Sequence, residues 1–152
     1  MHILTLCDHE PVTVSPDTTV AEAIKLMLKR RIGAVVVVEG KFVKGIFTER
    51  DVLKKVALSG HDPAKTLVSE VMTSPVENAS PKTTPGEALA SMLKHHFRHM
   101  PVVDAKGRLK GVLSIRDLLY EQMQEIKRQH ESLEHYVSSE RLGMPAARDA
   151  TD

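Results

Sequence analysis

Two short segments combine a hydroxyl with a carboxylate three residues later. They are Thr48-x-x-Asp51 and Ser114-x-x-Asp117, and each follows an apolar run that is typical of a strand. Where a strand gives way to a helix, the free amides and the positive end of the helix dipole favour a phosphate. The hydroxyl can add a donor to that phosphate, and the carboxylate can accept hydrogen bonds from both hydroxyls of a cis-diol. The same spacing also satisfies a helix capping box, which needs no ligand.

Both segments belong to an internal repeat. Val14-Ser15-Pro16 returns as Ala79-Ser80-Pro81, 65 residues later, and the interval becomes 66 where 44–51 recurs as 110–117. A repeat of this kind describes one supersecondary unit that cannot bury its apolar face alone. We therefore expect two copies packed about a pseudo-two-fold axis, with any groove between them present twice. A single Ser/Thr-x-x-Asp favours the capping explanation, whereas two copies within a whole matching repeat reverse that preference.

Each copy predicts the order strand, helix, strand, strand, helix. Thr19 and Thr84 are each followed by a glutamate three residues on, so capping boxes should begin helices near 19–31 and 84–96. Short polar turns separate the apolar stretches at 34–38 and 100–103 from second strands ending near Phe47 and Leu113, which predicts two hairpins. The second turn has one extra residue, which explains the change of interval. Each copy should then enter a second helix, which occupies about 49–58 in the first copy and begins at 115 in the second.

The last predicted helix is longer than the repeat requires. From residue 119 its side chains follow a heptad pattern, with spacings that alternate between four and three: Leu119, Met123, Ile126, His130, Leu133, Val137. This pattern fits a helix folded back on its own domain and a helix that dimerises equally well. We assign 1–67 to the first repeat with its linker, 68–120 to the second, 121–140 to the helix extension and 141–152 to a disordered tail.

Composition argues against several classes of protein. The 152 residues are 41% apolar and 27% charged, which is typical of a soluble globular domain. Lys and Arg (21) nearly balance Asp and Glu (20), and only 3% of residues are aromatic, so nucleic acid and anionic membranes are disfavoured as partners. The single cysteine, Cys7, excludes an intrachain disulfide. Without a transmembrane-length apolar run or a signal-peptide pattern, we expect a cytoplasmic protein.

The sequence predicts neither a metal site nor an enzyme. His95, His96 and His99 could be metal ligands, but no Cys or paired carboxylate accompanies them, so solvated or phosphate-side histidines are favoured. The chain lacks a glycine-rich phosphate loop with Lys-Ser/Thr, a zinc-protease helix and a Gly-x-Ser-x-Gly elbow. Asp51 and Asp117 should lie in opposite clefts, too far apart to share a proton as an acid–base pair.

Aligned in this way, the chain resembles a pair of cystathionine-β-synthase (CBS) domains over about residues 3–120. The resemblance rests on the glycine-containing motifs 45–51 and 111–117, on 98–103 and on the linker 68–73. It implies an α+β fold of tandem β-α-β-β-α repeats with pseudo-two-fold symmetry and two clefts, to which this chain adds a long C-terminal helix. It also implies an adenine nucleotide ligand (AMP, ADP, ATP or NAD(H)), no required cofactor, and a homodimer.

The resemblance assigns ribose and phosphate contacts to both clefts. Thr48 and Asp51 would serve one cleft, and Ser114 and Asp117 the other. The residues before the second strand of each copy would lie beside the phosphates: Gly33 and Ala34 in the first copy, and Arg98, His99 and Met100 in the second. Arg98 can make fork-shaped phosphate contacts and His99 is a titratable donor, so the Asp117 cleft is the better equipped.

The remaining site residues implied by the resemblance surround the adenine or reach between the clefts. Val12 and Thr13 would lie beside the Asp117 cleft, and Val76 and Glu77 beside the Asp51 cleft. Ile46 and Val112 would pack on the adenine ring. Arg50 and Arg116 either reach across to the phosphates of the other cleft or remain solvated, and the sequence does not decide between these roles.

The function hypothesis is a regulatory module that binds adenine nucleotide in one or both clefts and transmits occupancy to an unidentified protein partner. The long helix is the expected lever or docking surface. The alternative is a scaffold with empty clefts that acts through dimerisation.

Overall fold

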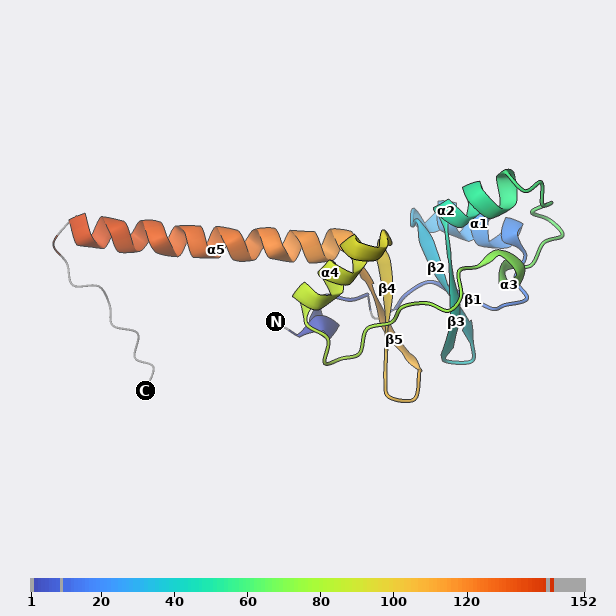
Figure 1. The fold of residues 1–152 in the computed structure, drawn as a ribbon, viewed down its shortest axis with the longest axis horizontal. Coiled ribbons are helices and arrows are strands. Elements are labelled where there is room, and N and C mark those ends of the chain that lie inside the picture. The colour runs from blue at the N-terminus through green and yellow to red at the C-terminus, as the bar shows by residue number, and fades with distance from the viewer. Residues whose placement is uncertain (1, 9, 142, 144–152) are drawn as a thin grey trace.

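The chain forms two small β-sheets, each flanked by helices, and one long helix that leaves the body (Figure 1). The structure is a computed structural model and describes residues 2–8, 10–141 and 143. In the first sheet, β1 (Thr13–Val14) pairs in parallel with β2 (Ala34–Glu39), which pairs antiparallel with β3 (Phe42–Thr48). In the second, β4 (His99–Val103) pairs antiparallel with β5 (Leu109–Ser114). The predicted α+β repeat architecture is therefore confirmed.

Helices α1 (Val20–Arg30) and α4 (Pro85–His95) begin and end in the same way. Thr19 and Thr84 each accept a bond from the amide of a glutamate three residues on, whose carboxylate bonds back, so both predicted capping boxes are present. Both helices end at a left-handed residue, Arg31 or His96. These caps determine where each helix begins and where it ends before the strand that follows.

The second helices of the two repeats differ. In the first repeat, α2 (Glu49–Asp51) makes one α-helical turn, and Val52–Ala57 continues as a π-helix. In the second, α5 (Ile115–Arg141) is a continuous α-helix of 27 residues. The sequence predicts a helix at both places but not the wider winding at 52–57.

The two repeats exchange the segments that open them. The N-terminal segment, with a 3-10 turn at Ile3–Thr5, adds an edge to the second sheet, because Asp8 forms a bridge with Val112. Helix α3 (Val68–Val71) and the residues after it lie against the first sheet, where Thr73 forms a bridge with Ile46. The two apolar cores follow this exchange: Val68 and Val71 pack in the first core, and Ile3 and Cys7 in the second.

Two glycines make this close approach feasible. A Cβ atom on Gly45 would lie 2.5 Å from Met72 Sδ and 2.9 Å from the Thr73 carbonyl. A Cβ atom on Gly111 would lie 2.8 Å from the Asp8 carbonyl and closer still to Cys7 Sγ. The glycine in each repeat motif is thus explained by backbone packing on the exchanged segment.

Helix α5 extends away from the two sheets and is not folded back on them (Figure 1). Only Leu118 is buried along it, and α4 packs beside its first turns. No helix within the described residues is long and apolar enough to cross a membrane. Nearly all of the segment expected to be a disordered tail, 142 and 144–152, lies outside the described residues.

Candidate functional site

The aspartate at the first strand-to-helix junction is tied into the protein. Asp51 is buried, and its Oδ2 accepts bonds from the Thr48 amide (3.0 Å) and hydroxyl (3.2 Å). Its Oδ1 accepts a bond from the Thr73 hydroxyl (2.9 Å) and lies 3.1 Å from Lys55 Nζ. Both oxygens are occupied, so contact with a ribose would require exchange of these bonds.

The equivalent aspartate of the second repeat is free. The Asp117 amide donates to Ser114 Oγ (3.1 Å), which is one half of a capping box. Its carboxylate is exposed and has no hydrogen-bond or ion-pair partner among the described residues. The two junctions therefore match in backbone geometry but differ in the availability of the carboxylate.

A cluster of charged and titratable groups surrounds the second junction. His99 pairs with Ser114 across the β4–β5 ladder, and Arg98 accepts a backbone bond from Ile115 (2.8 Å). Burial lowers the pKa of His99, and the positive charge of Arg98 lowers it further, while Glu49 and Asp117 act in the opposite direction. His99 is therefore within electrostatic range of Asp117 and of Glu49, which belongs to the first repeat.

The corresponding position of the first repeat holds no cation. Ala34 pairs with Thr48 across the β2–β3 ladder, as His99 does with Ser114. A Cβ atom on Gly33 would lie 3.3 Å from the Glu49 carboxylate. An acidic side chain beside the first junction disfavours a phosphate there.

One arginine crosses between the repeats. Arg50 donates to the His96 carbonyl, at 3.4 Å, at the left-handed end of α4. Arg116, at the equivalent position of the second repeat, is exposed. Arg50 thus joins the first junction to the turn that precedes Arg98 and His99.

The other predicted site residues occupy varied positions. Ile46 is buried and Val112 half-buried. Val12 packs at the edge of the first core, and Met100 lies within the second core. Val76 is half-buried, whereas Glu77 is exposed and contacts Ser91 and, at 3.8 Å, His95. These contacts direct Glu77 toward α4.

A cavity of about 260 Å³ lies between the two hairpins. Residues of both repeats line it, among them Thr13 and Lys41 of the first and Arg108 and Lys110 of the second. Arg108 is held by Asp104 at 2.8 Å; the backbone amide of Arg108 is the main cause that lowers the pKa of Asp104 to about 2. The cavity lies at the hairpin turns, the opposite end of β5 from Ser114. Of the predicted residues it contains only Thr13.

Sequence reasoning did not identify Glu49, Lys55 or Thr73 as part of the junctions. Lys55 could have been found, because it lies four residues after Asp51 on the same helical face. Thr73 could not, since its contact depends on the exchanged segment. Among the described residues, no three His, Cys, Asp or Glu side chains converge as a metal site would require.

The sequence matches known proteins over both repeats. The family model for the CBS domain matches residues 3–58 and 68–124. The CBS domain-containing protein YhcV of Bacillus subtilis is 37% identical over 111 residues, which cover 73% of this chain and 78% of YhcV.

Solved structures share the fold. A protein with CBS domains from Burkholderia ambifaria is 35% identical, with a TM-score of 0.76, covering 82% of this chain and 95% of that one. The structure of CBSX2 in complex with AMP has a TM-score of 0.70 at 22% identity, covering 81% of this chain and 96% of CBSX2. At that identity the second likeness concerns the fold alone.

Proposed function

This chain belongs to the CBS domain family, and we propose that it is a regulatory module that binds an adenine nucleotide (AMP, ADP, ATP or NAD(H)) at its second strand-to-helix junction. The observation that carries the proposal is the free Asp117 carboxylate beside Arg98 and His99. A carboxylate without a protein partner can accept both ribose hydroxyls, and the nearby cation can balance phosphate.

The ligand class is supported by chemistry and by fold. Ser114 supplies a hydroxyl at the start of α5, where the positive end of the dipole of a long helix favours an anion. CBSX2, which shares the fold, has been solved with AMP. The first junction would bind nucleotide more weakly, because Asp51 must first give up Thr48, Thr73 and Lys55.

Regulation would act through α5. Ser114 and Asp117 lie at the base of this helix, so a nucleotide held there contacts the element that projects furthest from the body (Figure 1). The Arg50–His96 bond joins the first repeat to the same region. A nucleotide shifts the relative arrangement of the repeats only by its difference in affinity for the alternatives. The regulated partner would bind one arrangement of the repeats in preference to the other.

Isothermal calorimetry with AMP, ATP and NADH tests the proposal. We expect one of them to bind wild-type protein below millimolar concentration. Asp117→Ala should weaken binding by about 10- to 100-fold, the range for hydrogen bonds to a charged group. Glu125→Ala, which removes an exposed carboxylate further along α5, is the matched control and should bind as wild type does.

Two outcomes would contradict the proposal. If no nucleotide binds wild type below millimolar concentration, the dimerising scaffold with empty clefts becomes the better explanation. If Asp117→Ala binds as tightly as wild type, the nucleotide does not use the second junction.

A further inference from the structure

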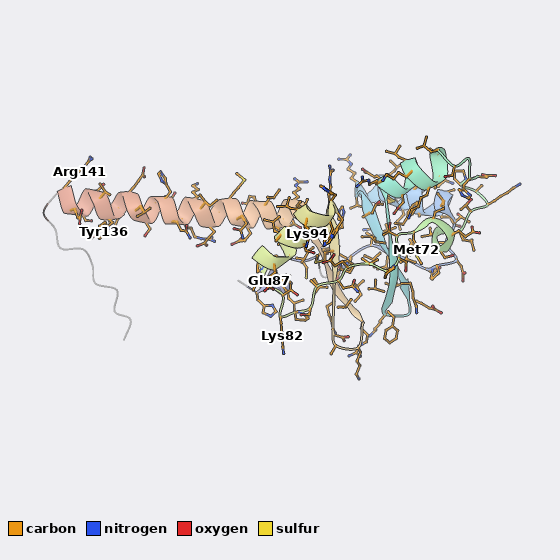
Figure 2. All side chains as sticks on the ribbon, in the orientation of Figure 1. Met72, Lys82, Glu87, Lys94, Tyr136 and Arg141 are labelled. Atoms are coloured by element: carbon orange, nitrogen blue, oxygen red, sulfur yellow. The ribbon has the colours of Figure 1, made fainter. Side chains whose placement is uncertain are left out.

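Helix α5 carries an apolar stripe that no described part of the chain covers. We define the seam as the six heptad residues of this helix: Leu119, Met123, Ile126, His130, Leu133, Val137. The apolar members of the seam are between 45% and 69% exposed. Tyr136, beside the seam, and Arg141 lie at the far end of the helix, away from both sheets (Figure 2). A contiguous exposed apolar stripe of this kind marks an interaction surface.

The opposite face of α5 is suited to water. Arg128 contacts Glu121 at 3.0 Å and Glu125 at 2.7 Å, and none of these three residues belongs to the seam. In heptad notation the seam places Leu119, Ile126 and Leu133 at d positions, with Met123, His130 and Val137 at a positions. Leucine at d is a preferred choice of parallel two-stranded coiled coils.

We propose that α5 pairs with the α5 helix of a second copy of this chain as a parallel, in-register coiled coil. This interface is separate from the nucleotide site and goes beyond the proposed function. It would give the protein a dimer whose nucleotide-binding bodies lie at the same end of a shared rod.

In this arrangement the residues that flank the seam on one helix face residues of compatible charge on the other. In a parallel pair, each g position faces the following e position of the second helix. Gln122 then faces Lys127, and Gln129 faces Glu134, so no like charges meet. The antiparallel alignment that buries the whole seam brings Lys127 opposite its own copy. A strongly acidic or basic partner is not favoured either, because Lys127 and Glu134 balance.

The available area is sufficient for a specific dimer. A 27-residue helix is about 40 Å long at 1.5 Å per residue. At roughly 100 Å² for each fully buried aliphatic side chain, the seam and its flanking tyrosines would remove on the order of 1,000 Å² from water in a pair. That is close to the lower limit for a specific interface. The dimer should therefore dissociate measurably on dilution.

His130 would set the register. It is the single polar member of the seam, and it lies 3.2 Å from Glu134 on its own helix. In a parallel pair the two copies of His130 meet at one layer, and any shift of register would bury each imidazole against aliphatic side chains. A polar residue at one a position specifies register at a cost in stability.

Sedimentation equilibrium of the full chain tests the interface. Wild type should dimerise, and Ile126→Glu/Leu133→Glu should raise the dissociation constant at least 100-fold. Gln124→Glu/Ser138→Glu adds the same two charges away from the seam and should dimerise as wild type does. A monomeric wild type, or a double seam variant that dimerises normally, would overturn the proposal, and the second result would locate the dimer contact elsewhere.

Disulfide trapping tests the orientation. Val137→Cys should crosslink readily, because the two copies of residue 137 meet in a parallel pair; wild type controls for the buried Cys7. Leu119→Cys/Val137→Cys would instead form 119–137 crosslinks between chains if the helices were antiparallel, which would overturn the parallel arrangement.

His130→Leu should tighten the dimer by removing the polar layer; unchanged or weaker association would contradict the register argument.

These measurements do not depend on nucleotide. The seam variants should bind nucleotide as wild type does, and Asp117→Ala should dimerise normally. Failure of the coiled coil and failure of the nucleotide proposal are therefore separate results.

Discussion

Asp51 and Asp117 occupy equivalent positions in the two repeats, yet their carboxylates have different surroundings. The Asp51 carboxylate is held by Thr73 and Lys55 as well as by its own helix start, whereas the Asp117 carboxylate has no hydrogen-bond or ion-pair partner among the described residues. The alignment of the repeats explains why. Asp8 stands where the first repeat has Thr73, and Glu121 stands where it has Lys55.

Both replacements exchange a donor for a carboxylate. Asp8 bridges Val112 just as Thr73 bridges Ile46, but a carboxylate lacks the hydroxyl donor that Thr73 gives to Asp51. Glu121 pairs with Arg128 instead. The first junction is therefore tied into the protein, whereas the second is open. Two residues outside the motif are enough to account for this difference between the copies.

The largest expected effect is on stability. Asp51→Ala should lower the free energy of unfolding by about 2–3 kcal/mol, because it removes a buried carboxylate that accepts hydrogen bonds from Thr48 and Thr73. Asp117→Ala should change it by less than about 0.5 kcal/mol, as is usual for an exposed residue. Urea denaturation of both variants measures the difference. Equal losses would mean that the two aspartates have the same role.

A second experiment gives the Asp117 carboxylate internal partners without altering the motif 114–117. Asp8→Thr/Glu121→Lys gives the second repeat the residues that hold Asp51. We expect nucleotide affinity to fall by about tenfold as Asp117 gains internal partners, while thermal stability rises. Calorimetry and thermal unfolding measure the two changes, and Asp8→Asn/Glu121→Gln controls for the loss of negative charge. Unchanged affinity with a raised melting temperature would show that Asp117 is not the ribose contact.

The smallest expected effect is a pH dependence of binding. Burial holds the pKa of His99 below its ordinary value, so this imidazole is neutral at pH 7 and becomes protonated only under acid conditions. A bound phosphate favours the protonated form, so affinity should rise by about threefold between pH 7.5 and 6. His99→Gln should remove the part of the rise that is due to the protein. Identical pH profiles for the two proteins would exclude a His99–phosphate contact.

The lowered pKa of His99 also affects the stability of the protein without ligand. Because the unfolded chain binds a proton at His99 more readily than the folded chain does, stability falls as pH drops below about 6.5. The effect should be absent from His99→Gln.

Most of the fold could be predicted because the local signals were duplicated. Thr19 and Thr84 mark the two first helices, and both hairpins follow from apolar runs around polar turns. The open orientation of α5 could not be predicted, since a heptad pattern describes a covered face without saying what covers it. The π-helix at 52–57 also carried no recognised signal.

The candidate site was predicted less completely than the fold. The motifs locate Asp51 and Asp117, but they predict the same role for both aspartates and do not reveal that only Asp51 is paired. The difference arises from Thr73 and Lys55, and only the first of these depends on contacts distant in the sequence. The i+4 spacing of Lys55 was available from the sequence and would have suggested that Asp51 is paired.

The exchange of opening segments has a consequence for biosynthesis. The first sheet can acquire its Thr73 edge soon after residue 73 is made, but Asp8 must wait for Val112, which is 104 residues later in the chain. During translation the apolar side chains of Ile3 and Cys7 therefore lack their native neighbours until β5 is complete. Such long-range pairing slows folding, and it makes the segment 3–8 one of the last parts of the described chain to acquire its native contacts.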